Sequence, residues 1–271
     1  MRTPVAVALT FHVIGRFSRG QVRTRWVDST RPRIAEVEAG IERAWQEASR
    51  RPGVRLFDEP MCRLESFHAA ADQLTLLLSR TSYKTFVGTN YADPQLADRY
   101  GPQVLANPLG ISSLVGSGDG WVLLGRRSAA VAQYPLRIHT FGGALQVEEA
   151  ADVFATAGRE LAEELNLRDD DVRQIVCIGL VEDQSLRHPE LIFHASSGLG
   201  RAQIEQKLDQ AEHSAAVAIQ AQADEVRSAA ADPALTPVAA AALLLWGRHQ
   251  FGADWFDAAR QAVKFGGHEP A

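Results

Sequence analysis

Short apolar runs of strand length alternate along this chain with longer segments of helical periodicity, and clusters of Gly, Pro and polar residues separate them. The runs predict strands at residues 5–11, 22–27, 54–57, 62–69, 73–78, 111–115, 120–125, 136–141, 172–183, 190–196 and 215–219. Helical patterns cover residues 33–50, 94–99, 149–166, 200–210 and the Ala-rich segment after Asp224. The run 76–78 fits a turn of buried helix equally well. Strands with interleaved helices indicate an α/β sandwich.

Three zones follow one another along the chain. Residues 1–109 form an N-terminal α+β extension that ends in a turn-rich connector, residues 110–222 form the central α/β domain, and residues 223–271 form C-terminal helices. Neither an internal repeat nor a low-complexity linker separates the zones. We therefore expect the extension to pack on the central domain, giving one compact body.

Composition narrows the class of protein. The chain has 271 residues and a net charge of −5, and its basic and acidic residues are interspersed, which argues against a broad nucleic-acid-binding surface. The short basic runs Arg31–Arg33 and Arg50-Arg51 are interpreted as solvated faces. No run of about eighteen apolar residues is present, so no membrane span is expected.

The two cysteines and the N-terminal residues indicate the cellular compartment in which the chain is expected. Cys62 and Cys177 lie in apolar runs without metal or disulfide spacing, which indicates buried thiols in a reducing environment such as the cytoplasm. The apolar stretch Val5–Phe11 lacks a recognisable cleavage site after it, so we interpret it as a first strand and not as a signal peptide.

The segment 159–167, Arg-Glu-Leu-Ala-Glu-Glu-Leu-Asn-Leu, carries the strongest chemical signal. Glu160, Glu163 and Glu164 are spaced so that a helix presents all three on one face, where like charges repel. Oxygen ligands on a rigid element suit a hard cation such as Mg²⁺ or Mn²⁺. A solvated acidic face is the alternative. The apolar stripe on the other side of the helix consists of Val153, Ala157, Leu161 and Leu165.

A strand, a glycine pair (Gly142-Gly143) and a helix ending in R-E-L-A-E-E-L-N-L resemble the signature of the Nudix hydrolase family, G-x5-E-x7-R-E-U-x-E-E-x-G-U with U a bulky aliphatic residue. Asn166 replaces the last Gly, and Asn also tolerates the left-handed conformation at a helix end. The loop is two residues longer than the pattern allows, which puts Ala151 at the place of the first Glu. Glu148 or Glu149 is a candidate to replace that carboxylate, and Glu149 would share the face of Glu160 if the helix extends that far.

A second motif narrows the resemblance. The segment from Tyr83 to Tyr91, Y-K-T-F-V-G-T-N-Y, precedes Asn107-Pro108-Leu109-Gly110 and Arg126-Arg127-Ser128. These segments are similar to the animal UDP-glucose/UDP-galactose diphosphatase branch of the family, over about residues 56–219. Departures from that branch lie at Cys62, where an aromatic residue is expected, at His139, where an acid is expected, and at 144–146, where a His and an acid are missing.

The resemblance implies a Nudix-type α/β/α sandwich with a mixed sheet, and it implies roles for individual residues. Glu160 and Glu164 would bind Mg²⁺ or Mn²⁺, Glu163 would assist, and Arg159 would orient a neighbouring carboxylate. Implied substrate contacts are Tyr83, Arg127, Ala132, Gly142 and Gly143. Glu163, Glu182 and Glu190 are all candidates for the general base. The remaining histidines show no paired metal spacing and are interpreted as structural or exposed: His12, His68, His188, His194, His213, His249 and His268.

The implied function is metal-dependent hydrolysis of a small-molecule nucleotide sugar, UDP-glucose or UDP-galactose, to UMP and hexose 1-phosphate. Another nucleoside diphosphate derivative, such as ADP-ribose or a dinucleotide, is an alternative substrate, because fold does not fix substrate. A degenerate Nudix module that only binds is the alternative from another class. No nucleic acid or membrane partner is expected, and the sequence leaves the oligomeric state and the preferred hexose open.

Overall fold

The computed structural model describes residues 9–50 and 56–263. The strands are β1 (Leu9–Phe17), β2 (Val22–Trp26), β3 (Pro60–Ala70), β4 (Gln73–Ser82), β5 (Gly110–Gly116), β6 (Trp121–Arg127), β7 (Ile138–His139), β8 (Phe141–Ala144), β9 (Val172–Asp183), β10 (His188–Ser197) and β11 (His213–Gln220). The α-helices are α1 (Ala35–Ser49), α2 (Tyr83–Phe86), α3 (Leu96–Tyr100), α4 (Val153–Leu165), α5 (Arg201–Lys207), α6 (Ala223–Ala230), α7 (Pro237–Phe251) and α8 (Ala253–Ala262).

The larger sheet is eight-stranded and mixed. Its order is β1-β9-β10-β5-β6-β11, with β7 beside β6 and β8 beside β5. β10 and β5 run parallel, whereas β1 with β9, β9 with β10, and β6 with β11 are antiparallel. A smaller sheet has the order β2-β4-β3. The mixed α/β class predicted from the sequence is confirmed.

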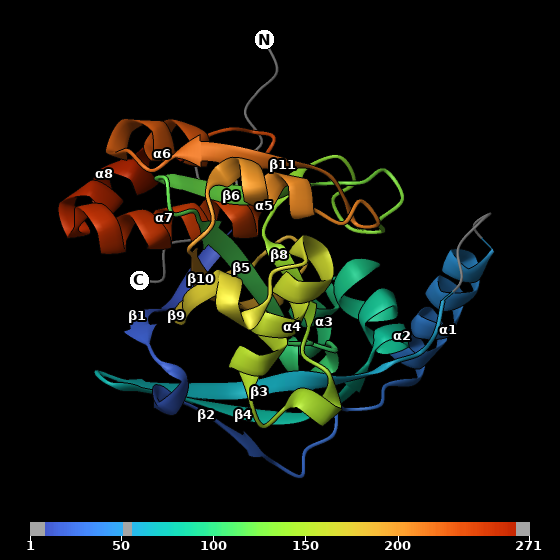
Figure 1. The fold of residues 1–271 in the computed structure, drawn as a ribbon. Helices are drawn as coiled ribbons and strands as arrows, with labels where there is room; N and C mark the ends of the chain where they lie inside the picture. The colour runs from blue at the N-terminus through green and yellow to red at the C-terminus, as the bar shows by residue number, and fades with distance from the viewer. Residues whose placement is uncertain (1–8, 51–55, 264–271) are drawn as a thin grey trace.

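Two apolar cores cover opposite faces of the large sheet. Helices α6, α7 and α8 pack on one face, where Leu243, Leu244 and Leu245 of α7 are fully buried. Helix α4 and the inner side of the smaller sheet pack on the other face, around Phe154, Leu76 and Phe193. In Figure 1 the smaller sheet lies at the bottom, and the C-terminal helices, in orange and red, lie at the upper left beside β6 and β11. Trp246, Trp255 and Phe256 of the C-terminal helices are buried in this arrangement, and Phe251 is partly buried against the same core.

The structure refines several predicted elements. The run at 76–78 belongs to strand β4, not to a helix turn. The segment predicted as one strand at 136–141 splits into β7 and β8, and the glycine pair lies inside β8 and not in a loop. The predicted strand 54–57 lies partly outside the described residues, and its described part, 56–57, has no regular structure. Within the connector, α2 and a π-helix at Val87–Tyr91 were not predicted.

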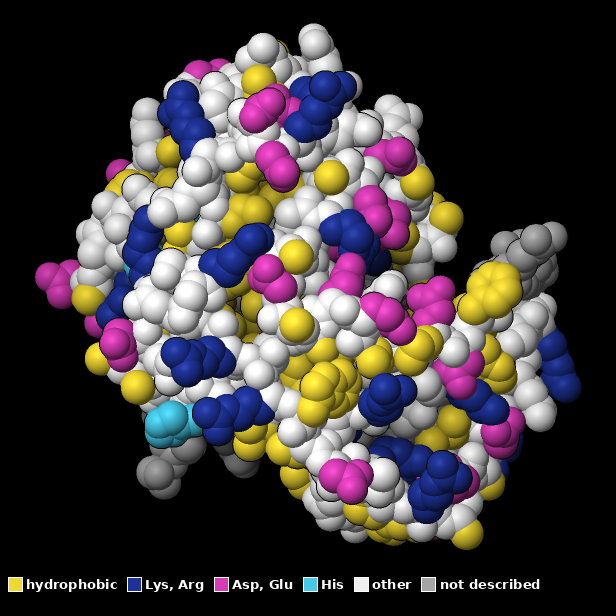
Figure 2. Space-filling model, turned by 60° about the horizontal axis from the view of Figure 1, so that its bottom comes forward, with side chains coloured by type: hydrophobic (Ala, Val, Ile, Leu, Met, Phe, Trp, Pro, Cys, Tyr) yellow, Lys and Arg dark blue, Asp and Glu magenta, His cyan; other side chains and the backbone are white. Residues whose placement is uncertain are grey.

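Surface and burial agree with the composition. On the face that Figure 2 shows, acidic and basic side chains are intermixed, without one broad surface of a single sign. Cys62 and Cys177 are buried free thiols. No helix within residues 9–50 and 56–263 is long and apolar enough to cross a membrane.

The N-terminal segment contributes a strand to the large sheet. β1 pairs with β9 from Leu9↔Asp183 to Phe17↔Cys177, and Val13 and Phe17 are buried in the core beneath α4. A fragment that begins near residue 100 would lose β1 and the whole smaller sheet, and it would expose apolar side chains that are buried in the intact chain. We therefore expect limited proteolysis to yield no stable, soluble fragment beginning near residue 100. Recovery of a folded fragment with that start would contradict the packing described here.

Candidate active site

Helix α4 positions the carboxylates, and its limits follow from its sequence. Asp152 caps the N-terminus by accepting hydrogen bonds from the backbone N–H groups of Phe154 and Ala155. The predicted apolar stripe is buried, with exposures of 2% or less. Asn166 ends the helix in the left-handed conformation, at φ 49°. The helix is shorter than predicted, because residues 147–149 form a separate 3₁₀ turn.

Two of the three carboxylates on α4 are buried. Glu160 and Glu164 are 8% and 6% exposed, whereas the side chain of Glu163 is 59% exposed. Burial raises the pKa of Glu160 to about 7, and burial together with the charge of Glu212 raises that of Glu164 to about 8. Desolvation disfavours a carboxylate charge unless a cation or hydrogen-bond donors compensate. Glu160 and Glu164 thus form a buried pair of carboxyl groups whose negative charge is disfavoured unless a cation compensates it.

The glycine pair of β8 lies against these carboxylates. The backbone N–H of Gly142 donates to Glu164 Oε2 at 3.1 Å. A Cβ at position 143 would lie 2.6 Å from Glu160 Oε1, so a larger residue there would displace that carboxylate from its described position. Gly142 itself has φ +146°, and a Cβ there would lie 1.8 Å from the carbonyl oxygen of Ile111. The close approach of the backbone therefore requires glycine at position 142, and glycine at position 143 lets the Glu160 carboxylate approach β8.

Arg159 forms ion pairs with three carboxylates, those of Glu149, Glu160 and Glu163. Its Nε and Nη2 contact the two oxygens of Glu149 at 2.5 and 3.1 Å, Nη2 donates to Glu160 at 2.9 Å, and Nη1 donates to Glu163 at 2.7 Å. Glu149 reaches Arg159 from the 3₁₀ turn, although the helix itself does not extend to that residue. Of the two candidates for the missing first carboxylate, Glu149 has this contact, and Glu148 is exposed without a described ion pair.

The donor set suits a hard divalent cation by its chemistry, since two buried carboxylates and an adjacent exposed one lie within one turn of α4. In the described conformation, however, Arg159 supplies the positive charge between Glu160 and Glu163. No three His, Cys, Asp or Glu side chains converge on one point in the described part of the chain. For all three carboxylates to bind one cation, the Glu163 side chain would have to turn from Arg159 toward Glu160 and Glu164.

A cavity of about 170 Å³ adjoins the glycine pair. Four of the predicted substrate contacts line it: Tyr83, Arg127, Gly142 and Gly143. The fifth, Ala132, is not among its lining residues. Ala132 is exposed, and its carbonyl accepts a hydrogen bond from Tyr91 Oη, while its neighbour Gln133 lines the cavity instead. The contact between Ala132 and substrate therefore stays a prediction.

The guanidinium group of Arg127 contributes a positive charge to the lining of the cavity. Its Nε donates to the carbonyl of Gln133 at 2.9 Å, and within the described residues no carboxylate pairs with its guanidinium. Burial lowers its pKa, opposed by the nearby charges of Glu212, Glu164 and Glu190. Arg126, the next residue on β6, instead donates to the carbonyl of Leu136 and does not line the cavity, as expected from the alternation of side chains along a strand.

We predict that Arg127→Lys lowers turnover of every diphosphate substrate, by roughly tenfold or more, because lysine keeps the charge but loses the two-pronged contact with phosphate oxygens. Steady-state kinetics on at least two substrates tests this. Arg126→Lys is the matched control, since it makes the same change one residue away and outside the cavity. Equal effects of the two substitutions would refute a phosphate-binding role for Arg127.

The aromatic wall of the cavity comes from α2. Tyr83 packs edge-on against Trp45 of α1, with ring centroids 6.1 Å apart, and lies beside Phe86. Phe86 in turn contacts the ring of His188. Ser82 caps this single turn by accepting a hydrogen bond from the Thr85 N–H. The Tyr83–Tyr91 motif therefore forms a compact helical wall, and not an extended loop.

Strand β10 contributes two cavity residues: Glu190, a candidate base from the sequence, and His188, which the sequence indicated to be structural or exposed. His188 and Glu190 lie two positions apart and therefore share one face of the strand. Glu190 accepts from Ser112 Oγ, and His188 Nδ1 lies 3.3 Å from Glu190 Oε1. Although burial opposes it, His188 and Ser112 hold the pKa of Glu190 down at about 2. The alternation of side chains along a strand could have placed these two residues on one face from the sequence alone.

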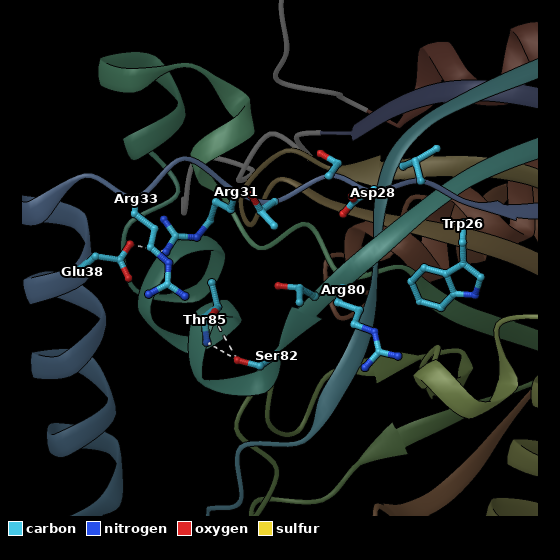
Figure 3. A pocket seen from close by; sticks show the side chains of 12 residues that line it. Trp26, Asp28, Arg31, Arg33, Glu38, Arg80, Ser82 and Thr85 are labelled. Carbon is cyan, nitrogen blue, oxygen red and sulfur yellow. Dashed lines mark hydrogen bonds and ion pairs between the residues drawn. The ribbon is translucent and has the colours of Figure 1, made fainter.

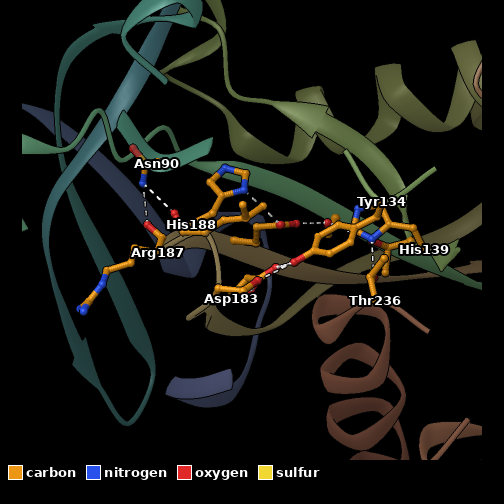
Figure 4. Close-up of polar contacts among 12 residues, drawn as sticks. Asn90, Tyr134, His139, Asp183, Arg187, His188 and Thr236 are labelled. Carbon is orange, nitrogen blue, oxygen red and sulfur yellow. Dashed lines mark hydrogen bonds and ion pairs between the residues drawn. The ribbon is translucent and has the colours of Figure 1, made fainter. Parts of the chain in front are cut away.

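Figure 4 shows the polar contacts that surround this pair. On one side, Asn90 donates to the carbonyl oxygens of Leu186 and Arg187, which fixes the turn before β10. On the other, Tyr134 Oη donates to Asp183 at 2.5 Å, and His139 contacts Thr236 at 2.7 Å. Of the three candidate bases, Glu190 lines the cavity, Glu163 pairs with Arg159, and Glu182 pairs with His12 outside it.

Comparison with known proteins shows which proteins this chain is similar to. No family model matches the chain. The uridine diphosphate glucose pyrophosphatase NUDT22 of Homo sapiens is 28% identical over 160 residues, which are 48% of this chain and 53% of the relative. The protein of the same name from Bos taurus is 36% identical over 101 residues, 32% of this chain and 35% of the relative. The chain thus spans about half the length of these curated relatives, or less.

Among solved structures, a mutT/nudix family protein from Listeria innocua aligns with 17% identity and a TM-score of 0.40, covering 53% of this chain and 92% of its own. A likeness this distant adds nothing to the description of the fold, which is established by the sheet order and layers of this chain alone. The resemblance to the Nudix hydrolase family is confirmed by the curated relatives. Within that family, the similarity is to the uridine diphosphate glucose pyrophosphatases.

Proposed function

We propose that this chain is a metal-dependent Nudix hydrolase that cleaves the diphosphate of a nucleotide sugar, UDP-glucose or UDP-galactose, to UMP and hexose 1-phosphate. The observation that carries the proposal is the meeting of Tyr83, Arg127 and the glycine pair around one cavity, with Glu160 and Glu164 buried against those glycines. The names and sequence similarity of the curated relatives support the same substrate class.

Each residue has a task that follows from its position. Arg127 extends a guanidinium into the cavity and would bind a phosphate oxygen pair. Tyr83, held by Trp45, offers a rigid ring for the uracil or the sugar. Glu160 and Glu164, joined by Glu163, would hold Mg²⁺ or Mn²⁺. When bound, the ion withdraws charge from the diphosphate and lowers the pKa of a water molecule.

Arg159 would act on the other side of these carboxylates. By contacting Glu149, Glu160 and Glu163 at once, it restricts the rotamers of the proposed metal ligands, and its charge limits their mutual repulsion. The burial of Glu160 and Glu164 also argues against a module that only binds. Two buried, crowded carboxylates cost stability in a fold that makes no use of them.

Substrate preference provides the test of the nucleotide-sugar part of the proposal. We expect UDP-glucose or UDP-galactose to be hydrolysed faster than ADP-ribose or a dinucleotide, and Tyr83→Ala to reduce that difference, because selectivity is a difference in transition-state binding. Values of kcat/KM on the four substrates give the answer. Tyr83→Phe separates the two tasks of the ring, since it keeps stacking and removes the hydroxyl.

Tyr100→Ala is the control for the loss of a tyrosine, because Tyr100 bonds Glu36 on the surface and does not line the cavity. Equal rates on UDP-glucose and ADP-ribose, or unchanged selectivity in Tyr83→Ala, would remove the nucleotide-sugar assignment and leave the more general diphosphatase.

A further inference from the structure

A second hollow, of about 420 Å³, lies on the far side of α2 from the candidate active site. It is enclosed by the segment between β2 and α1, the end of β4, and α2. The lining residues that matter most are Trp26, Arg31, Arg33, Arg80, Ser82 and Thr85. Figure 3 shows Arg31 and Arg33 on one side of this hollow, Arg80 and Trp26 on the other, and Ser82 and Thr85 between them.

Three arginines, Arg31, Arg33 and Arg80, line this hollow together with two acidic residues, Asp28 and Glu38. Arg31 is engaged, since it pairs with Glu38 and donates to the carbonyl of Pro32. Arg33 and Arg80 have no carboxylate partner in the described part of the chain. Their guanidinium groups thus remain available for an anion, which revises the interpretation of Arg31–Arg33 as a merely solvated face.

The hollow also contains an aromatic surface. Trp26 ends the edge strand β2 and is 48% exposed, an unusual position for the largest apolar side chain. The guanidinium carbon of Arg80 lies 5.9 Å from the centre of its ring. An aromatic ring beside guanidinium groups is a surface on which a base stacks while its phosphates are neutralised. Asp28 adds an acceptor for a sugar hydroxyl at the rim.

We propose that this hollow is a second ligand site, for a nucleotide: Arg33 and Arg80 bind its phosphates and Trp26 stacks on its base. Inorganic phosphate fits the arginines but leaves Trp26 without a role. A nucleotide uses both features, and 420 Å³ accommodates a ligand of that size.

Helix α2 places the two cavities back to back. Ser82 and Thr85 line the second hollow, whereas Tyr83 and Phe86, from the same turn, line the candidate active site. A ligand in the hollow therefore contacts the turn that holds Tyr83, and we expect its binding to change the KM of the hydrolase. This regulatory part rests on the proposed function, whereas the binding part does not.

The test measures binding of ADP by isothermal titration calorimetry, in an Arg127→Ala background that weakens binding to the candidate active site. We expect about one ADP per chain in this background. Arg33→Ala/Arg80→Ala should weaken that binding by about tenfold or more, and Trp26→Ala should weaken it measurably. Arg23→Ala/Arg25→Ala, also on the β2 side of the molecule but outside the hollow, is the charge-matched control.

Several outcomes would overturn the proposal. ADP affinity that is unchanged in Arg33→Ala/Arg80→Ala, or lowered equally in the Arg23→Ala/Arg25→Ala control, refutes the site. Inorganic phosphate that binds as tightly as ADP refutes the nucleotide assignment. For the regulatory part, added ADP should shift the KM of the wild-type protein but not that of Arg33→Ala/Arg80→Ala. The same shift of KM in the wild-type protein and in Arg33→Ala/Arg80→Ala would refute the regulatory part. The calorimetry measures binding without turnover, so a failure of the proposed hydrolase function would not be mistaken for a failure of this site.

Discussion

Replacing both Glu160 and Glu164 by Gln is expected to reduce metal-dependent hydrolysis by at least about 100-fold while the protein stays folded. Loss of a residue that only orients a metal ligand already costs about 10–100-fold, so loss of two ligands costs at least as much. Gln keeps the shape of Glu and removes the charge that holds the ion. Because both carboxylates are buried and burial raises the pKa of each, removing their charges should not destabilise the apoprotein.

Steady-state turnover with Mg²⁺ or Mn²⁺, together with thermal unfolding, measures both parts of this prediction. Glu163→Gln is expected to lower turnover as well, since Glu163 completes the presumed ligand set. Asp170→Asn is the control, because it removes an exposed carboxylate shortly after the same helix. Undiminished turnover in the double variant would refute the assignment of α4 as the metal-binding element.

Gly142→Ala is expected to destabilise the protein by more than about 3 kcal/mol, beyond the usual range for one substitution. The added Cβ would lie 1.8 Å from the Ile111 carbonyl oxygen, so β8 would have to separate from β5, with which it pairs through Ser112↔Gly142. That movement would also withdraw the Gly142 N–H from Glu164. Both stability and activity should therefore fall.

Chemical denaturation compares this variant with Gly120→Ala. Gly120 also has a positive φ, +86°, but open space surrounds it, so its substitution isolates the backbone cost of about 1 kcal/mol. A Gly142→Ala protein no less stable than Gly120→Ala would contradict the close approach of β8 to β5.

The sequence predicted most reliably the features that depend on local pattern. The stripe from Val153 to Leu165 predicted the buried face of α4, and Asn166 adopts the left-handed conformation that its place in the motif suggested. Glu149 was one of two candidates for the missing carboxylate. Its contact with Arg159 depends on a 3₁₀ turn ahead of α4, which the continuous helical pattern concealed.

Features that depend on tertiary packing were harder to predict. Glycine pairs usually indicate loops, but Gly142 and Gly143 lie within strand β8. Glycine stands at these positions because the Ile111 carbonyl and Glu160 approach the strand closely. His188 and Glu190 reach the cavity only through the parallel pairing of β10 with β5, between segments distant in sequence. The burial of Glu164 beside His213 likewise depends on the pairing of β11 with β6.

The proposed activity is metal-dependent cleavage of a nucleotide-sugar diphosphate that depends on the α4 carboxylates. Its most direct test is ³¹P NMR of UDP-glucose incubated with the protein, with and without Mg²⁺ or Mn²⁺. We predict that UMP and glucose 1-phosphate form only with metal, and that Glu160→Gln/Glu164→Gln forms neither at a comparable rate. Absence of metal-dependent cleavage of UDP-glucose, UDP-galactose, ADP-ribose and a dinucleotide alike would contradict the account.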